Sequence, residues 1–116
     1  MAKDQVNEKY KDAVGKKWDG DKLRWDLLDL ELLEPIVYRF SRGAEKYGCR
    51  NWQLVDDAEE RYYAAGMRHL CEYRKGNIND DDPQFEKYPS HLAAACWNFL
   101  VLLWFEQQRT KNKNKK

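Results

Sequence analysis

The sequence predicts an all-α fold, a small bundle of three main helices. Apolar residues recur at intervals of three and four in two long segments, and a third segment is apolar on nearly every side. No segment alternates between apolar and polar residues, so no strand is indicated. The chain has 116 residues, enough for one domain with a modest core of the kind that oligomerisation often completes. We therefore expect a single helical domain that forms a homo-oligomer.

The N-terminal segment precedes the helices and is polar. Residues 1–19 form a lead-in to which we assign no regular element. Residues 20–26 combine charges with two large apolar side chains, Leu23 and Trp25, which we expect to pack as an ordered segment on the helices. The helical body is therefore predicted to span residues 20–108.

The first helix is predicted to begin near residues 31–34. Pro35 is compatible only with a first turn, where the amide hydrogen that proline lacks would have no partner. Gly48 ends the helix, because glycine readily adopts the positive φ of a helix stop. The predicted apolar face consists of Leu33, Val37, Phe40, Ala44 and Tyr47.

The second helix is predicted to start after Asp56 or Asp57, either of which can cap it, and to end at Gly76. The acidic connection that follows, residues 77–89, is long for a small helical domain, and loops of this length are often functional lids. The stripe facing the core is expected to consist of Tyr62, Ala65, Gly66, His69, Leu70 and Tyr73.

The third helix is predicted to be capped by Ser90 and to end at about Gln108. Residues 92–105 are apolar on nearly every side except at Asn98, which is typical of a helix at the centre of a bundle or at an oligomer interface. Residues 109–116 carry five cations, and we expect them to form a basic disordered tail.

Charge and cysteine content exclude several classes of protein. The formal net charge is +1, but without residues 109–116 the basic residues fall from 21 to 16 against 20 acidic ones, a net of −4. A mildly acidic body is not typical of a specific nucleic-acid-binding domain. Three cysteines without C-x-x-C spacing indicate neither a disulfide framework nor a zinc knuckle. Without a signal sequence or an apolar run of about 18 residues, we expect a cytoplasmic protein without membrane contact.

Residues 43–52 form the first candidate binding segment. A glycine ends the helix there, and the segment then supplies a cation, two aromatic rings and an amide, on a loop where binding residues concentrate. This mixture suits an anionic, planar ligand such as a nucleotide. The candidate contacts are Lys46, Tyr47, Asn51 and Trp52.

Two histidines and nearby carboxylates form the second candidate. His69 and Glu72 share a face of the second helix, and an antiparallel crossing can bring them to His91 at the start of the third, with residues 80–82 nearby. Such a group suits a divalent metal or acid–base chemistry. A structural role for each histidine is equally open, and an acidic loop is more often simply solvated. Arg68 is either a surface residue or a phosphate partner.

Several short motifs follow one another along the chain: DKLRWDLL at residues 21–28, GAEKYG at 43–48 with Asn51-Trp52, Arg68-His69-Leu70, the acidic loop, and HLAAA at 91–95 with Asn98. Over residues 20–106 this succession resembles the phage dATP/dGTP diphosphohydrolase N-terminal domain family. That family is associated with the MazG-like all-α pyrophosphohydrolases, metal-dependent enzymes that cut a dNTP into dNMP and pyrophosphate.

The resemblance implies a metal-dependent (deoxy)nucleoside triphosphate pyrophosphohydrolase of phage type, acting in the host cytoplasm as an oligomer with Mg²⁺ or Mn²⁺. It implies a polar centre at His69, Asp81 and His91, and Glu72 joins this centre from its helical spacing. The predicted catalytic residues are His69, Glu72 and His91, and the same three with Asp81 are the predicted metal ligands. The predicted substrate contacts are Lys22, Arg24, Lys46, Tyr47, Asn51, Trp52, Arg68 and Asn98.

The acidic residues depart from the MazG-like pattern. Glu31 and Glu34 imitate its first acidic pair, E-x-x-E, but the second, E-x-x-D, does not occur in the sequence. One alternative is therefore a non-catalytic nucleotide-binding protein, such as a phage sponge or sensor of a nucleotide signal. The other is a small protein-interaction module whose apolar third helix docks on a partner.

Overall fold

The computed structural model describes residue 16 and residues 20–114, so most of the predicted polar lead-in lies outside the described residues. Its α-helices are α1 (Glu34–Tyr47), α2 (Ala58–Arg74) and α3 (His91–Asn114), and the described residues contain no strand. The predicted all-α fold with three main helices is confirmed. Four short 3₁₀ helices accompany them: η3 (Trp25–Leu27), η4 (Leu30–Leu33), η5 (Asn51–Leu54) and η6 (Pro83–Phe85).

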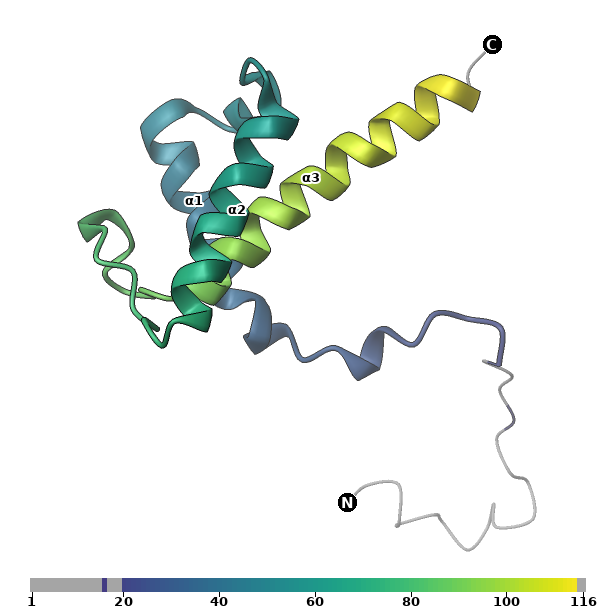
Figure 1. The fold of residues 1–116 in the computed structure, drawn as a ribbon. Coiled ribbons are helices and arrows are strands. Elements are labelled where there is room, and N and C mark those ends of the chain that lie inside the picture. The colour runs from purple at the N-terminus through teal and green to yellow at the C-terminus, as the bar shows by residue number, and fades with distance from the viewer. Residues whose placement is uncertain (1–15, 17–19, 115–116) are drawn as a thin grey trace, which may run out of the picture.

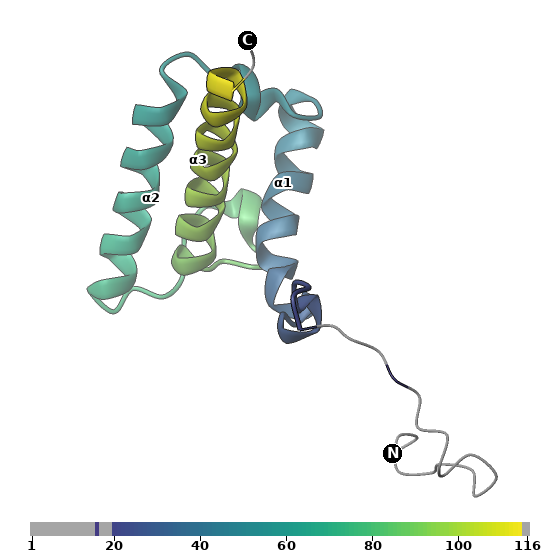
Figure 2. The same ribbon diagram turned by 90° about the vertical axis from the view of Figure 1, so that its right-hand side faces the viewer.

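The three α-helices form one layer. α3 packs against both neighbours and lies between them, with its most extensive contacts on α2 (Figures 1 and 2). None of the helices in the described part of the chain is long and apolar enough to cross a membrane. The layer has two faces, and no further element of the described chain covers either face completely.

α1 begins and ends as predicted, but it buries a different face. Pro35 occupies the first turn, and Gly48 ends the helix with φ 96° while its N–H donates to the Ala44 carbonyl. Two residues of the predicted apolar face, Val37 and Tyr47, are exposed. The buried residue of the helix is Arg39, because an ion pair to a distant loop turns this side of α1 inward.

α2 approaches α3 closely at a glycine. A Cβ on Gly66 would lie 2.5 Å from a carbon of the Phe99 ring, so only glycine leaves room for this ring. Asp57 precedes the helix, as predicted, but its side chain makes no capping hydrogen bond. Gly76 has φ 96° just after the helix, in agreement with the predicted stop.

α3 starts as predicted and ends later than predicted. The Ser90 hydroxyl accepts a hydrogen bond from the Ala93 N–H at 3.0 Å, which confirms the cap. The helix continues past Gln108 to Asn114, so residues 109–114 are helical rather than disordered. These residues include no proline or glycine, and Arg109 pairs with Glu59 of α2, which supports the extra turns. The last two residues of the predicted tail lie outside the described residues.

Residues 20–33, which we call the arm, project away from the helical layer (Figure 1). The expected packing of its large apolar side chains on the body is wrong for this chain alone, since Leu23 is 80% exposed and Trp25 is 76% exposed. Only η4, at the end of the arm, has substantial contacts with α1. Within residues 20–114, no surface covers the leucines of the arm.

The close contact of α2 and α3 predicts opposite effects for two Gly→Ala substitutions. Gly66→Ala should destabilise the fold, because overpacking against Phe99 costs about 1–3 kcal/mol, more than the helix gains from alanine. Gly43→Ala, in α1 with nothing within 4 Å, should stabilise by about 0.5–1 kcal/mol. Urea unfolding followed by circular dichroism measures both. A Gly66→Ala protein as stable as Gly43→Ala would contradict the contact.

Candidate functional site

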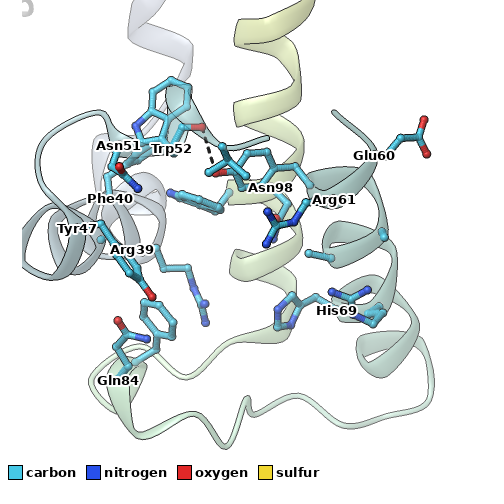
Figure 3. Close-up of a pocket in the computed structure, with 18 of the residues that line it drawn as sticks. Arg39, Phe40, Tyr47, Asn51, Trp52, Glu60, Arg61, His69, Gln84 and Asn98 are labelled. Carbon is cyan, nitrogen blue, oxygen red and sulfur yellow. Dashed lines mark hydrogen bonds between the residues drawn. The ribbon is translucent and has the colours of Figure 1, made fainter. Parts of the chain in front are cut away.

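A cleft of about 950 Å³ opens on one face of the helical layer. α1 and α2 form its sides, α3 contributes from behind, and η5 and η6 close it above and below in the view of Figure 3. Six of the lining residues are aromatic: Phe40, Tyr47, Trp52, Tyr62, Phe85 and Trp97.

Most of these rings support one another at the η5 end of the cleft. Phe40 lies 5.8 Å from Trp52 and 5.4 Å from Trp97 between ring centroids, and Tyr62 lies 5.6 Å from Trp97. The Tyr62 hydroxyl donates to the Trp52 carbonyl at 3.1 Å, which ties η5 to α2. A set of rings held in this way provides a rigid apolar wall for a planar ligand.

Cations dominate the charged residues of the cleft. Arg39, Arg61 and Arg68 line it, and Glu60 is the only carboxylate among the lining residues. Arg39 and His69 enter the lower part of the cleft from opposite sides (Figure 3). Guanidinium groups bind phosphate through two parallel hydrogen bonds, so this lower end suits an anionic group.

Two histidines meet beside the lower end of the cleft. His69 of α2 and His91 of α3 face each other with their Nδ1 atoms 3.0 Å apart. The acidic loop is held against them at its base, where Asp80 N–H donates to the Pro89 carbonyl and His91 N–H donates to the Ile78 carbonyl, both at 2.9 Å. These bonds place Asp80 beside the rings, and one ligand atom from each of the three side chains lies within 4.8 Å of the others.

Arg39 fixes the carboxylate of this group. Its Nη2 donates to Asp80 Oδ2 and to the Ser90 carbonyl, both at 3.3 Å, and its guanidinium lies 4.0 Å from the centroid of the Phe85 ring. The second oxygen of Asp80 accepts from the Asp82 N–H at 3.2 Å. Arg39 is not among the residues that the sequence predicted for the site. The only signal in the sequence was its helical spacing, which puts Arg39 on the same side of α1 as Ile36, Phe40 and Gly43. None of these three residues is fully exposed.

Burial lowers the pKa of two groups at the centre of the site, His69 and Arg39. Desolvation lowers the pKa of His69, and the neighbouring cations Arg39 and Arg68 lower it further, while Asp80 opposes them. Desolvation also lowers the pKa of Arg39, against the hydrogen bond and charge of Asp80. His69 is therefore held neutral near neutral pH, the state in which an imidazole nitrogen can bind a metal.

The donor set fits a divalent transition metal. Two imidazole nitrogens and one carboxylate are typical of three-ligand metal sites that leave positions for water or substrate. Asp80 is oriented by hydrogen bonds to its two oxygens, as carboxylates that ligate metals are. His69, Asp80 and His91 are therefore the residues of the described chain best placed to hold such an ion.

The structure brings together about half of the residues predicted for the site. His69 and His91 meet, and Asp80 occupies the place expected for Asp81, which is exposed and outside the group. Glu72 pairs instead with Lys75 at 3.6 Å. Of the predicted substrate contacts, those that line the cleft are Tyr47, Asn51, Trp52, Arg68 and Asn98.

The remaining predicted contacts lie elsewhere. Lys22 and Arg24 belong to the arm, where Arg24 forms an ion pair with Asp26 at 2.6 Å. Lys46 lies outside the cleft lining, with its ammonium 5.1 Å from the Tyr47 ring centroid.

The acidic pair that imitates a MazG-like motif does not face the cleft. Glu34 accepts a hydrogen bond from the Tyr88 hydroxyl at 3.0 Å. Glu31 is an exposed residue of η4, and neither carboxylate lines the cleft. The candidate metal site is therefore built from histidines and Asp80, and these two glutamates are not part of it.

Two buried donors of the cleft walls lack an acceptor within the described part of the chain: Arg39 Nε and Trp97 Nε1. A buried N–H without an acceptor costs about 1–3 kcal/mol, so such groups are uncommon away from functional sites. Both residues line the same cleft.

The lowered pKa of His69 predicts that acid destabilises the metal-free protein. The unfolded chain takes up a proton near the ordinary pKa of 6.5, while the folded protein resists protonation, so stability falls as the pH drops from this value through the lower folded pKa. Thermal unfolding in chelator, from about pH 8 to about pH 5, should show this fall. His69→Gln should flatten it, and an unchanged slope would show that His69 is not the group responsible.

Comparison with protein families places these features in a known group. Residues 12–115 match the family described as dATP/dGTP diphosphohydrolase, N-terminal, a range that includes the three helices, the cleft and the histidine pair. Comparisons with curated proteins and with solved structures gave no match. The chain belongs to the dATP/dGTP diphosphohydrolase N-terminal domain family.

Proposed function

We propose that the cleft binds a purine deoxynucleoside triphosphate and that the protein hydrolyses it to the nucleoside monophosphate and pyrophosphate with the help of a divalent metal. The observation that carries this proposal is the difference in chemistry between the two ends of the cleft. Its connected aromatic rings lie at the η5 end, and the other end holds Arg39 and Arg68 and adjoins His69, Asp80 and His91. A nucleotide has the same two-part chemistry. The family description names dATP and dGTP, which supports a purine base.

The aromatic end suits the base. Stacking on aromatic side chains stabilises a bound base by about 1–3 kcal/mol, and Trp52, Phe40 and Trp97 form a connected wall there. The amides of Asn51 and Asn98 line the same cleft, and amides can donate to and accept from the edge of a base. The side-chain N–H of Asn98 already donates to the Ala94 carbonyl at 2.8 Å.

The cationic end suits the triphosphate. Arg68 precedes His69 on α2 and lines the cleft, so its guanidinium can bind phosphate oxygens beside the histidine pair. In the reaction, the oxygen of a water molecule attacks the α-phosphorus, and the bond from this phosphorus to the oxygen bridging the α- and β-phosphates breaks. Pyrophosphate leaves with the bridging oxygen, and arginines at this end offset its charge.

His69, Asp80 and His91 would hold the metal. A divalent ion held there would offset the charge of phosphate oxygens and would make water a better nucleophile. Two imidazole ligands favour a transition-metal ion such as Mn²⁺ over Mg²⁺, which prefers oxygen ligands. Arg39 holds Asp80 in place, and desolvation keeps His69 neutral. In a phage-encoded protein this activity would change the nucleotide pool of the host cytoplasm.

One observation favours a second candidate, a protein that binds the nucleotide without cutting it. The described cleft has a single lining carboxylate, Glu60, and Glu34 is engaged with Tyr88 away from it. The acidic cluster that MazG-like enzymes use is therefore missing from this cleft, while the aromatic wall and the arginines remain.

The proposed metal site predicts different effects for two neighbouring aspartates. Asp80→Asn should weaken Mn²⁺ binding at least about tenfold, because it removes a charged ligand next to the histidines. Asp81→Asn removes the same charge one residue away and should leave the affinity nearly unchanged, since Asp81 is exposed and outside the group. Calorimetric titration of the chelator-treated protein measures both affinities. Equal effects of the two substitutions would exclude Asp80 as a specific ligand.

The proposed reaction predicts that dATP or dGTP yields dNMP and pyrophosphate in the presence of Mn²⁺. His69→Ala and His91→Ala should each lower the rate at least about a hundredfold while the circular dichroism spectrum stays helical. Chromatography of the products measures the reaction, and Leu54→Ala, a change of an exposed residue outside the cleft lining, is the control. If dATP and dGTP raise the melting temperature but no monophosphate forms, the non-catalytic candidate is correct.

A further inference from the structure

The described chain lacks a large apolar core. Among its apolar residues only Ala58, Ala94, Ala95 and Val101 are buried, and Val101 is the largest side chain that is fully buried. Leucines, which usually fill such a core, are instead distributed over the surface. A helical layer with so little interior needs another surface to cover its leucines.

The arm carries the largest group of these leucines. Within residues 20–33, six large apolar side chains are between 41% and 80% exposed: Leu23, Trp25, Leu27, Leu28, Leu30 and Leu32. η3 is not among the elements with extensive contacts to the helices, and the arm points away from them in Figure 1. The arm therefore presents apolar surface that none of the described residues of its own chain covers.

α3 carries a second uncovered apolar surface. Leu92, Cys96, Leu100 and Leu103 follow one another at intervals of four, four and three, so they share one face of the helix. All four are exposed, the three leucines by 39–45%. We call these four residues the α3 stripe. The cleft-lining residues of α3, Trp97 and Asn98, are not among them.

We propose that the arm of one copy of this chain packs on the α3 stripe of a second copy. Each chain then supplies both an uncovered arm and an uncovered stripe, so two copies satisfy each other reciprocally without another partner. The charges agree with this pairing. The arm has four carboxylates and two cations, a net of −2, whereas residues 106–114 at the end of α3 have three cations and one carboxylate, a net of +2.

The area also agrees with a dimer. A fully exposed leucine-sized side chain presents on the order of 100 Å² of apolar surface. The arm and the α3 stripe together therefore expose roughly 600 Å² of apolar surface per copy. Stable interfaces bury about 800 Å² per partner, including polar and backbone atoms. The exchange of two arms is therefore large enough to hold two copies together.

A complementation experiment tests the proposal. The arm variant is Leu27→Lys with Leu30→Lys, and the stripe variant is Leu100→Lys with Leu103→Lys. Light scattering after size-exclusion chromatography should give the mass of a dimer for the unchanged full chain and of a monomer for each variant alone. An equimolar mixture of the two variants should again contain dimers, because an intact arm of one meets an intact stripe of the other.

The control variant, Leu54→Lys with Ile78→Lys, changes two leucine-sized side chains that are 78% and 64% exposed outside both surfaces, and it should remain dimeric. A monomeric unchanged chain, or a mixture that stays monomeric, would overturn the proposal. Dimers of each variant alone would overturn it as well, since they would show contacts elsewhere.

A measurement on the unchanged chain covers the case in which a lysine variant fails to fold. All three cysteines are exposed in the isolated chain. If an arm covers the α3 stripe, Cys96 reacts with a thiol reagent more slowly than Cys49 and Cys71 in the full protein. Equal reactivity of the three thiols would show that the stripe is open and would refute the proposal.

Discussion

The buried ion pair between Arg39 and Asp80 is the interaction on which the rest of the site depends. The Arg39 side chain is 6% exposed and that of Asp80 12%, and 41 residues separate them in the sequence. Removal of one partner of such a pair costs about 3–5 kcal/mol, because the other charge stays buried. The pair orients α1, holds the base of the acidic loop against α3, and fixes the carboxylate beside His69. The position of α1 and the placement of the Asp80 carboxylate beside His69 therefore both follow from this one ion pair.

A single layer of helices explains the position of both uncovered surfaces. With α3 between α1 and α2, one face of the layer is hollowed into the cleft, where aromatic rings and arginines line the walls. Leucines of α3 outside the cleft lining, and those of the arm, stay in contact with water in the isolated chain. A ligand on the first face and a second copy on these leucines could be bound at the same time.

Local rules predicted most helix ends but not the end of α3, which continues from the predicted Gln108 to Asn114. Long-range contacts determined the other features that these rules missed. Pro35, Gly48, Gly76 and Ser90 act through the conformation and hydrogen bonds of their own backbone, so helix starts and stops could be predicted from neighbouring residues. The inward face of α1 could not, because it depends on the distant Asp80. The same applies to the third member of the histidine group: spacing indicated an acidic loop near His69 and His91, but only its folded base selects Asp80.

The isolated β-bridge between Asn79 and Ser90 separates two parts of the acidic loop. Its hydrogen bonds hold the two ends of the loop together next to Asp80 and His91, so residues 81–88 begin and end at fixed points. Changes in the length or sequence of this excursion would alter the rim of the cleft near Gln84 and Phe85 without displacing the clamped residues. Substrate preference could thus diverge among related chains while the backbone positions of Asp80 and His91 stay fixed.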